Sequence, residues 1–432
     1  MQTSLQGIAK KAKREKKYRF RNLYGMLNEE MLGDCWRDIR KDAAYGVDRV
    51  SAQDYGQNLE ENIRQLVERL KRRRYRAKLV RRQYIPKGDG KPRPLGIPAT
   101  EDKLLQLAVT RILTAIYEQD FLRCSYGYRP NVGALDAVDK LSVKLQFGRY
   151  DYVVEADIKG FFDNIEHEWM MQMLAERIDD RALLWLIKKW LKAGVLDTDG
   201  KVLHPVTGTP QGGIISPILA NVYLHYALDL WFEKEAKRRC GGEACLIRYA
   251  DDYVCAFQHQ TEAERFYNEL GPRLGKFGLE LSEEKTRVIP FNREEPSRRA
   301  CFEFLGFEFY WAKDRSGKVH LKRRTSRKKL RGSLKRLTEW CKKNRNMKLA
   351  LLFNRLNTKL RGYYNYYGVQ GNFASLKQFF ESAMRILMKW LNRRSQRCSY
   401  NWIGFGTLIE LFKVVRPRIA GRSRRRAVTS PA

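Results

Sequence analysis

The stretch LIRYADDYVCAF, residues 246–257, places two adjacent carboxylates, Asp251 and Asp252, between two apolar runs. β-Branched and aromatic residues in these runs predict two short strands around a tight turn at Ala250 and Asp251. Adjacent carboxylates at such a turn repel each other, so burying them is unfavourable unless a cation lies beside them. A lone Asp-Asp pair is most often only an exposed turn, so the rest of the sequence must decide between these two interpretations.

A third carboxylate, Asp157, stands at the end of another β-prone run upstream. The loop PQGG, residues 210–213, lies between them; its glycines let a substrate approach the backbone closely, and Gln211 can hold a polar group. Phe161 and Phe162 offer a flat apolar wall suited to a sugar, although either alone would more often be a core residue. Three carboxylates on two neighbouring strands are the oxygen ligands that nucleotidyl transfer with two Mg²⁺ ions requires.

The overall charge of the chain points to a polyanionic partner. Its 432 residues include 84 lysines and arginines against 49 aspartates and glutamates, a formal net charge of +35. Such a surplus causes self-repulsion in the folded state, so nucleic acid is the first partner to consider and an anionic membrane surface the second. With 43% hydrophobic and 12% aromatic residues, the chain can bury proper cores, and its length suits two or three domains.

Membrane, secretory and zinc proteins fit the sequence poorly. The long apolar stretch at residues 214–231 is interrupted by polar residues and a proline, so no membrane span is expected. No apolar segment follows the basic run at residues 10–21, so a signal peptide is not expected either. The 8 cysteines are scattered and the 5 histidines lie far apart, which favours a reduced, cytoplasmic protein without a zinc site.

Periodicity outlines the remaining elements. Helices are predicted over residues 59–70, 169–178, 183–191, 219–223, 330–337, 349–360 and 376–391. Strands are predicted over residues 152–158, 246–248, 253–257 and 302–310, with a hairpin over residues 84–98 whose tip carries Lys87, Lys91 and Arg93. Helical spacing favours core packing for at least half of the tyrosines at 363, 364, 366 and 367. The basic run at residues 10–21 fits RNA binding and a solvated arm equally well.

Four stretches resemble reverse transcriptase motifs in the family's order. They are DIKGFFD (157–163) for the first palm motif, TPQGGIISP (209–217) for the QGxxxSP loop, YADD (249–252) for YxDD, and FLGF (304–307) for the later FLG strand. Together they are far more specific than any one alone.

Within this superfamily the chain most resembles the group II intron-encoded reverse transcriptase/maturases over about residues 40–410. The stretches that carry this resemblance are GVDRVS (46–51), the hairpin through residue 98, SYGYRP (125–130), LNTKLRGYYNYY (356–367) and YNWIGF (400–405). In LSEEKT, residues 281–286, serine stands where the family has asparagine. Few residues follow the last motif and they hold no Cys/His cluster, so the chain resembles the branch that lacks an endonuclease domain.

The resemblance implies an α+β right-hand polymerase, with fingers, a palm built on an antiparallel sheet, and a helical thumb, followed by a short basic C-terminal region. The expected divisions are residues 1–148 for the N-terminal extension and fingers, 149–315 for the palm, 316–392 for the thumb or maturase domain, and 393–432 for a basic nucleic-acid-binding region.

It also implies roles for individual residues. The expected catalytic and metal-binding groups are Asp157, Asp251 and Asp252, with the Ile158 carbonyl completing the shell of one of two Mg²⁺ ions. Those expected at the nucleotide are Lys87 and Arg93 on the triphosphate, Phe162 as a steric gate against a 2′-hydroxyl, and Gln211 with Gly212 lining the pocket. Those expected to contact nucleic acid are Lys322, Arg323, Arg324, Arg327, Lys328, Lys329 and Arg361.

The implied function is an RNA-directed DNA polymerase that binds its own group II intron RNA, assists its splicing and copies it into DNA. Its partners would be that RNA, an RNA template with a DNA primer, and dNTPs, in a bacterial-type cytoplasm near the nucleoid, with no membrane. A domesticated relative acting in DNA repair or phage defence is the main alternative. A splicing factor with an inactive polymerase is disfavoured, because the full set of carboxylates is present. The sequence leaves the oligomeric state open.

Overall fold

The computed structural model describes residues 4–86, 92–204, 206–209, 212–294, 296, 300–314, 316–394 and 399–420. The chain divides into two compact units, one built from residues 1–132 and 154–288 and the other from residues 133–153 and 289–431. Both units combine helices with largely antiparallel sheets, so the expected α+β class is confirmed.

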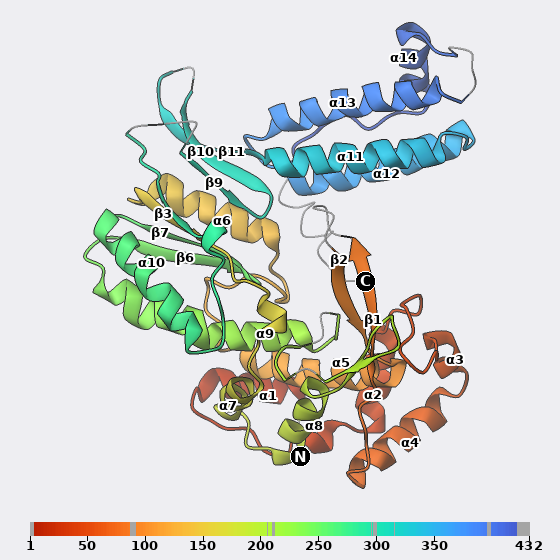
Figure 1. Cartoon of the computed structure of the whole chain (residues 1–432), viewed down its shortest axis with the longest axis vertical. Coiled ribbons are helices and arrows are strands. Elements are labelled where there is room, and N and C mark those ends of the chain that lie inside the picture. Colours follow the sequence, from red (N-terminus) through yellow and green to blue (C-terminus); the bar gives the residue numbers. More distant parts are fainter. Residues whose placement is uncertain are drawn as a thin grey trace. The chain divides into compact units, whose positions relative to one another are not determined.

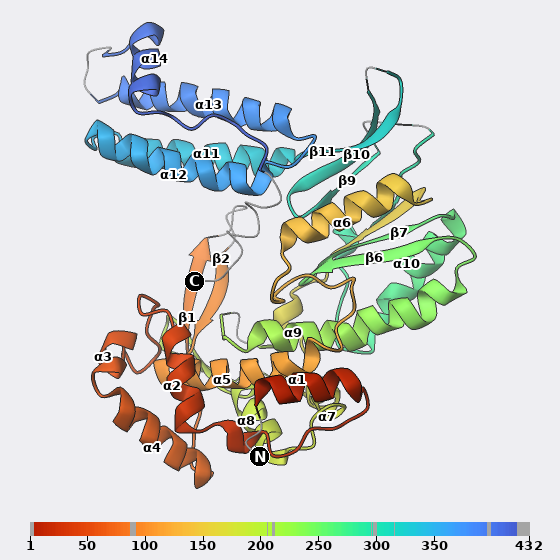
Figure 2. The same cartoon turned by 180° about the vertical axis from the view of Figure 1, so that it is seen from behind.

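Helices dominate the start of the first unit. They are α1 (Leu5–Arg14), α2 (Glu29–Asp38), α3 (Ala52–Gln57), α4 (Leu59–Lys71) and α5 (Thr100–Tyr117). Helix α5 lies at the centre of this group, because its apolar residues are buried on nearly every turn. Helices α1, α2 and α3 pack against it, and Figure 2 shows α1 alongside α5.

The basic run at residues 10–21 is part of this folded unit, so its interpretation as a solvated arm is wrong. Arg177 is 3% exposed and donates hydrogen bonds to the carbonyls of Ala12 at 3.2 Å and Glu15 at 3.0 Å. The same guanidinium forms an ion pair with Asp120 at 2.8 Å. A buried arginine thus donates to the carbonyls at the carboxyl end of α1 and fixes the run to the unit.

Two sheets follow in the first part of the chain. The expected hairpin is confirmed as β1 (Val80–Pro86) paired with β2 (Pro92–Ile97), although its tip lies outside the described residues. Strands β4 (Val195–Leu196) and β5 (Val202–Leu203) extend this sheet in the order β2-β1-β4-β5. The second sheet has the order β6-β7-β3-β8, from β3 (Tyr152–Ala156), β6 (Ala244–Tyr249), β7 (Asp252–Phe257) and β8 (Arg287–Pro290).

Four helices accompany this second sheet in the sequence and complete the first unit (Figure 1). They are α7 (His167–Ala175), α8 (Arg181–Leu191), α9 (Ser216–Leu224) and α10 (Gln260–Gly275). The first three confirm the predicted helices, and α9 continues into π-helical turns at His225–Asp229 and Phe232–Ala236.

The second unit holds a small sheet followed by a group of helices. Its strands are β9 (Cys301–Phe304), β10 (Phe307–Lys313) and β11 (Val319–Thr325), in the order β11-β10-β9, and α6 (Ala134–Phe147) packs against β11. The single strand predicted over residues 302–310 is wrong, because the chain turns sharply at Leu305 and Gly306. Both residues have left-handed φ values, 50° and 82°, which glycine adopts readily and which end the strand.

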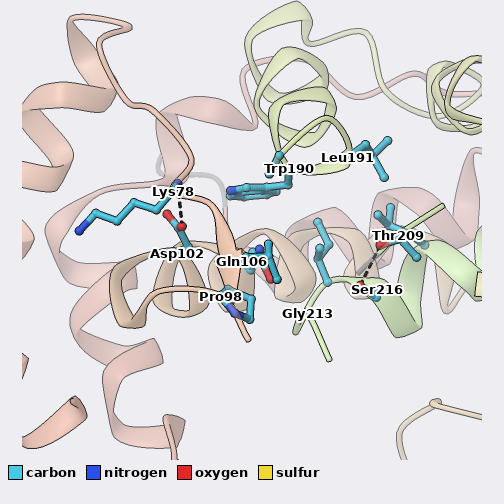
Figure 3. Close-up of a pocket in the computed structure, with 13 residues that line it drawn as sticks. Lys78, Pro98, Asp102, Gln106, Trp190, Leu191, Thr209, Gly213 and Ser216 are labelled. Atoms are coloured by element: carbon cyan, nitrogen blue, oxygen red, sulfur yellow. Dashed lines mark hydrogen bonds between the residues drawn. The ribbon is translucent and has the colours of Figure 1, made fainter. Parts of the chain in front are cut away.

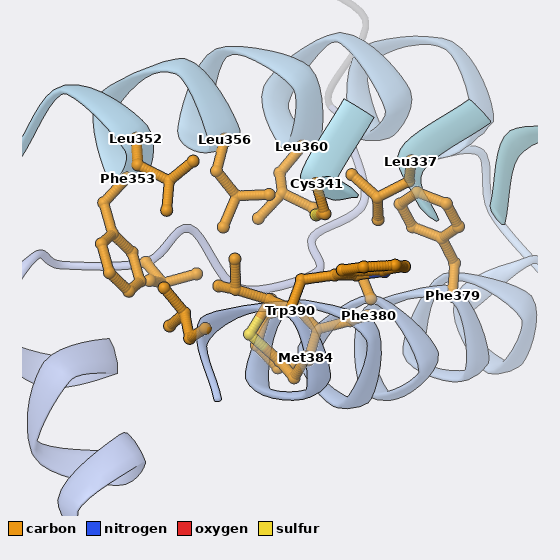
Figure 4. Packing of buried hydrophobic residues seen from close by; sticks show 14 of the residues in the cluster. Leu337, Cys341, Leu352, Phe353, Leu356, Leu360, Phe379, Phe380, Met384 and Trp390 are labelled. Carbon is orange, nitrogen blue, oxygen red and sulfur yellow. The ribbon is translucent and has the colours of Figure 1, made fainter. Parts of the chain in front are cut away.

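The three helices predicted over residues 330–337, 349–360 and 376–391 are confirmed as α11 (Arg327–Asn344), α12 (Leu349–Tyr367) and α13 (Phe373–Leu391). Figure 4 shows leucines of α12 facing Phe380, Met384 and Trp390 of α13 in one apolar core. A further helix, α14 (Trp402–Leu411), follows. No helix in the described ranges is long and apolar enough to cross a membrane.

Tyrosines of α12 belong to this core, as their helical spacing predicted. Tyr364 is fully buried, and Tyr363 stacks on Phe379 with ring centroids 3.6 Å apart. Tyr366 donates a hydrogen bond from its hydroxyl to the Leu305 carbonyl at 2.8 Å. These contacts tie α12 to α13 and to the turn of the small sheet.

Candidate active site

The two adjacent carboxylates lie at the predicted turn. Strands β6 and β7 pair antiparallel, with Tyr249 opposite Asp252, so that Ala250 and Asp251 form the tip. Ala250 has a φ of 56°, in the left-handed region that alanine rarely adopts. The turn is therefore conformationally unusual and must be held by its surroundings.

The carboxyl group of Asp251 is half-buried and lies near other charged side chains. Burial raises the pKa of its carboxyl, and the negative charge of Asp157 raises it further, while Arg93 and Arg248 act in the opposite direction. The structure thus brings two of the expected catalytic carboxylates and the expected triphosphate arginine into one neighbourhood. Tyr128, to which the sequence analysis assigned no role, is another neighbour: burial raises the pKa of its hydroxyl, and the negative charge of Asp251 raises it further.

Asp157 follows β3 and is paired with a lysine. The Nζ of Lys285 lies 2.6 Å from Asp157 Oδ2, and this hydrogen bond raises the pKa of the lysine, with a smaller contribution from Asp252. The Asp157 carbonyl accepts a hydrogen bond from the Ser282 amide at 2.8 Å. Sequence analysis assigned no role to Lys285, although its place in the LSEEKT stretch was a usable signal.

The carboxylates suit Mg²⁺ in their chemistry, although they are not gathered into a cage. Within the described ranges, no three His, Cys, Asp or Glu side chains stand close enough to hold a metal ion. Carboxylate oxygens are nevertheless the ligands that Mg²⁺ prefers, and a cation would relieve the repulsion between Asp157 and Asp251. Ile158 lies opposite Leu281 in an isolated antiparallel bridge, and the hydrogen bonds of this bridge are made by the residues on either side of the pair. The Ile158 carbonyl therefore points away from Leu281.

Two of the expected nucleotide-pocket residues, Phe162 and Gly212, lie at the loop that follows β5. Phe162 is buried edge-on against Phe161, with ring centroids 5.2 Å apart, and its carbonyl accepts a hydrogen bond from the Thr209 amide at 2.8 Å. Gly212 has a φ of 117°, and a Cβ there would lie 2.7 Å from the carbonyl oxygen of Gly96 in β2. The loop therefore packs on the strand that carries Arg93. Lys87 and Gln211 lie outside the described residues.

A small cavity beside this loop is too small to hold a nucleotide. Its volume of about 10 Å³ suffices for one water molecule. Gln106 accepts a hydrogen bond from the Ile214 amide at 3.0 Å. The Thr209 and Ser216 hydroxyls lie 2.8 Å apart (Figure 3). Asp102 accepts a hydrogen bond from the Lys78 amide at 3.1 Å, and burial raises the pKa of its carboxyl to about 6.

The buried side chain of His225 gives a prediction about how stability depends on pH. Burial lowers the pKa of His225 to about 4, and its ring packs against Phe121 with centroids 5.7 Å apart. Because the folded pKa lies below the unfolded value of 6.5, the unfolded chain binds a proton at His225 more readily than the folded chain does. The stabilisation from keeping His225 neutral and buried is therefore fully present above pH 6.5 and is lost as the pH falls towards 4. Between pH 7.5 and pH 5 the loss is about 2 kcal/mol.

Urea denaturation of the wild type and His225→Leu at both pH values tests this expectation. Other groups titrate alike in the two proteins, so the difference between them isolates the histidine. We expect the free energy of unfolding to fall by about 2 kcal/mol less in His225→Leu. Equal losses in the two proteins would contradict the prediction.

The basic residues expected to contact nucleic acid divide into two groups. Arg323 forms an ion pair with Asp139 at 2.7 Å, and Arg324 forms one with Glu308 at 2.8 Å, so both are engaged within the second unit. Lys322 lies on β11 and donates a hydrogen bond to a backbone carbonyl of β10. The exposed members of this set are Arg327, Lys328 and Lys329 in the first turn of α11 and Arg361 on α12.

Comparison with known proteins gives matches over most of the chain. Residues 85–309 match the reverse transcriptase (RNA-dependent DNA polymerase) family model, and residues 320–404 match the group II intron, maturase-specific domain. The chain is 31% identical over 404 residues to the group II intron-encoded protein LtrA of Lactococcus lactis subsp. cremoris, covering 74% of this chain and 65% of that protein. It thus spans about two thirds of that relative's length.

The comparisons give two further similarities, one to a curated protein and one to a solved structure. Protein YkfC of Escherichia coli (strain K12) is 31% identical over 308 residues, covering 64% of this chain and 78% of that protein. Among solved structures, telomerase from Candida albicans in complex with a fragment of telomeric RNA aligns with a TM-score of 0.43 and 13% identity, over 84% of this chain and 66% of that chain.

Proposed function

The chain belongs to the reverse transcriptase family and carries a group II intron maturase-specific domain, and from that premise we propose that it is an RNA-directed DNA polymerase serving its own group II intron RNA. It would bind that RNA, assist its splicing and copy it into DNA. The observation that carries the polymerase activity is the convergence of Asp157, Asp251 and Arg93 at the β6–β7 turn.

The catalytic step follows from the chemistry of these side chains. Asp157, Asp251 and Asp252, with the Ile158 carbonyl, would hold two Mg²⁺ ions, which supply charge neutralisation for attack by the primer 3′-hydroxyl and for release of pyrophosphate. Lys285 forms an ion pair with Asp157 and places a positive charge beside this carboxylate. By fixing where the ions sit, these carboxylates would orient the reacting groups for in-line attack.

Other residues of the first unit would select the nucleotide. Arg93 binds the triphosphate through charge-assisted hydrogen bonds, together with Lys87 of the same hairpin. Phe162 excludes a ribose 2′-hydroxyl, while Gln211 and the backbone at Gly212 line the pocket. Deoxynucleoside triphosphates are therefore the proposed substrates.

Nucleic acid would be held largely by charge. An RNA template or an RNA–DNA hybrid is recognised through its backbone. The exposed basic side chains at residues 327–329 and Arg361 in the second unit suit contacts with backbone phosphates. Binding should weaken steeply with salt, because each phosphate contact releases counterions. The maturase-specific match over residues 320–404 supports intron RNA as the resident partner.

Primer extension by the purified full chain tests the proposed activity. A DNA primer annealed to an RNA template should be extended with dNTPs in Mg²⁺, and EDTA should stop the reaction until Mg²⁺ is restored. Absence of extension by folded protein that binds the template–primer would contradict the polymerase assignment.

A further inference from the structure

A segment distant in the sequence runs beside the catalytic turn. Residues 124–128 form a short parallel addition to β6: the Arg248 amide donates to the Cys124 carbonyl at 2.7 Å, and the Tyr126 amide donates to the Arg248 carbonyl at 2.9 Å. Strand β6 lies at the edge of its sheet, so this segment covers the edge next to Asp251. All of these residues lie in the first unit.

The segment touches the backbone of the turn itself. A Cβ at Gly127 would lie 2.2 Å from the Ala250 nitrogen and 2.9 Å from its Cα, so only glycine allows this contact. Asn221 of α9 fixes the position by donating a hydrogen bond to the Gly127 carbonyl at 2.7 Å. The hydrogen-bonded segment at residues 124–128 therefore packs directly against the backbone of the turn and supports it.

Arg248, two residues before the turn, links the segment at residues 124–128 to the turn through its side chain. Its side chain is 0% exposed, and it donates two hydrogen bonds to the carboxylate of Asp229, at 2.7 and 2.6 Å. Its other N–H groups donate to the Ser125 hydroxyl at 2.8 Å, the Asn221 side-chain oxygen at 3.1 Å and the Ala250 carbonyl at 2.9 Å. All five N–H groups of the guanidinium thereby have an acceptor.

One of these bonds acts on the catalytic residue through the backbone. The Ala250 carbonyl belongs to the peptide group that joins Ala250 to Asp251, so a donor fixed on it sets the orientation of that peptide. The left-handed conformation of Ala250, which costs on the order of 1 kcal/mol, persists only if the surroundings impose it. Asp229 lies on a π-helical turn, a local irregularity that often marks functional sites.

We propose that Arg248 is a positioning residue for catalysis, which acts with Asp229, Ser125 and the Gly127 backbone as a clamp that holds Asp251 in its productive place. The inference rests on the proposed polymerase function and adds a device that maintains its geometry. A buried ion pair could instead serve folding alone. The two roles differ in their effect on metal dependence, because Mg²⁺ demands near-ideal ligand geometry.

Two variants and one matched control separate these roles. Arg248→Lys keeps the positive charge but cannot bond Asp229 and the Ala250 carbonyl together, and Ser125→Ala removes a single hydrogen bond with little risk to folding. The control is Arg177→Lys, which weakens another buried ion pair, with Asp120, that anchors α1 and not the turn. Each is made in the full chain.

Steady-state primer extension and hydrogen exchange are measured on the same samples. For Arg248→Lys we expect kcat in Mg²⁺ to fall by about tenfold to a hundredfold, with a higher Mg²⁺ half-saturation and an unchanged Kd for template–primer. Activity should fall less in Mn²⁺. Ser125→Ala should shift in the same direction by a smaller factor. Amide exchange at residues 249–252 should be faster in both variants and unchanged in Arg177→Lys.

The proposal is overturned if Arg248→Lys and Ser125→Ala lose thermal stability as Arg177→Lys does while keeping wild-type metal dependence and exchange at the turn. If Arg248→Lys does not fold, Ser125→Ala decides alone. An inactive wild type would count against the polymerase function, whereas exchange at the turn would still test the clamp, because it needs no activity.

Discussion

Asp251→Asn is expected to lower the rate of RNA-templated primer extension by about a thousandfold or more, since loss of the proposed metal ligand would remove several kcal/mol of charge stabilisation. The amide has nearly the shape of the carboxylate, so the turn between β6 and β7 should remain folded. The affinity for RNA should stay within about twofold, because phosphate binding depends on basic residues. Single-turnover extension and filter binding measure the two quantities.

Asp199→Asn is a suitable control, because it removes an exposed carboxylate that forms an ion pair with Lys201. It should extend primers like the wild type. Measurable extension by Asp251→Asn at a rate near that of the control would contradict the assignment of Asp251 as a metal ligand.

Arg93→Ala is expected to raise KM for dNTPs by about tenfold to a hundredfold, because a hydrogen bond to a charged phosphate contributes about 1.5–3 kcal/mol. Arg93 pairs with Ile85 across the β1–β2 hairpin and lies within electrostatic reach of Asp251. Its guanidinium is thus beside the position where a triphosphate would meet the carboxylates.

Arg82→Ala provides the comparison for that variant, because Arg82 lies on the opposite strand of the same hairpin, across from Gly96. Its KM for dNTPs should change by less than about threefold, as expected for removal of one surface charge at a distance. Equal KM increases in the two variants would indicate a general effect of charge and would contradict a specific role for Arg93.

Local patterns in the sequence predicted the elements that frame the site. The apolar runs around Asp251 determine the β6–β7 hairpin, and leucines at helical spacing determine α11 to α13. The turn at Leu305 and Gly306 was missed because no polar residue marks it, and residues 304–307 read as part of one strand. Only the left-handed backbone there separates β9 from β10.

Side-chain partners brought together by tertiary structure could not be predicted. Arg323 and Arg324 look like part of a solvated basic run, yet each pairs with a carboxylate that the fold delivers, Asp139 or Glu308. Arg248 likewise stands in an apolar strand with no local sign of its partner Asp229. Spacing along the chain does not reveal such pairs, because burial of an ion pair depends on the three-dimensional surroundings.

Sequencing of the RNA that co-purifies with the full chain from its native source at moderate salt tests the central claim most directly. The proposed function predicts that one species dominates, and that it folds as a self-splicing group II intron and flanks the gene for this protein. A diverse RNA population without such an intron would contradict the intron partnership, and would leave a polymerase that serves another host process.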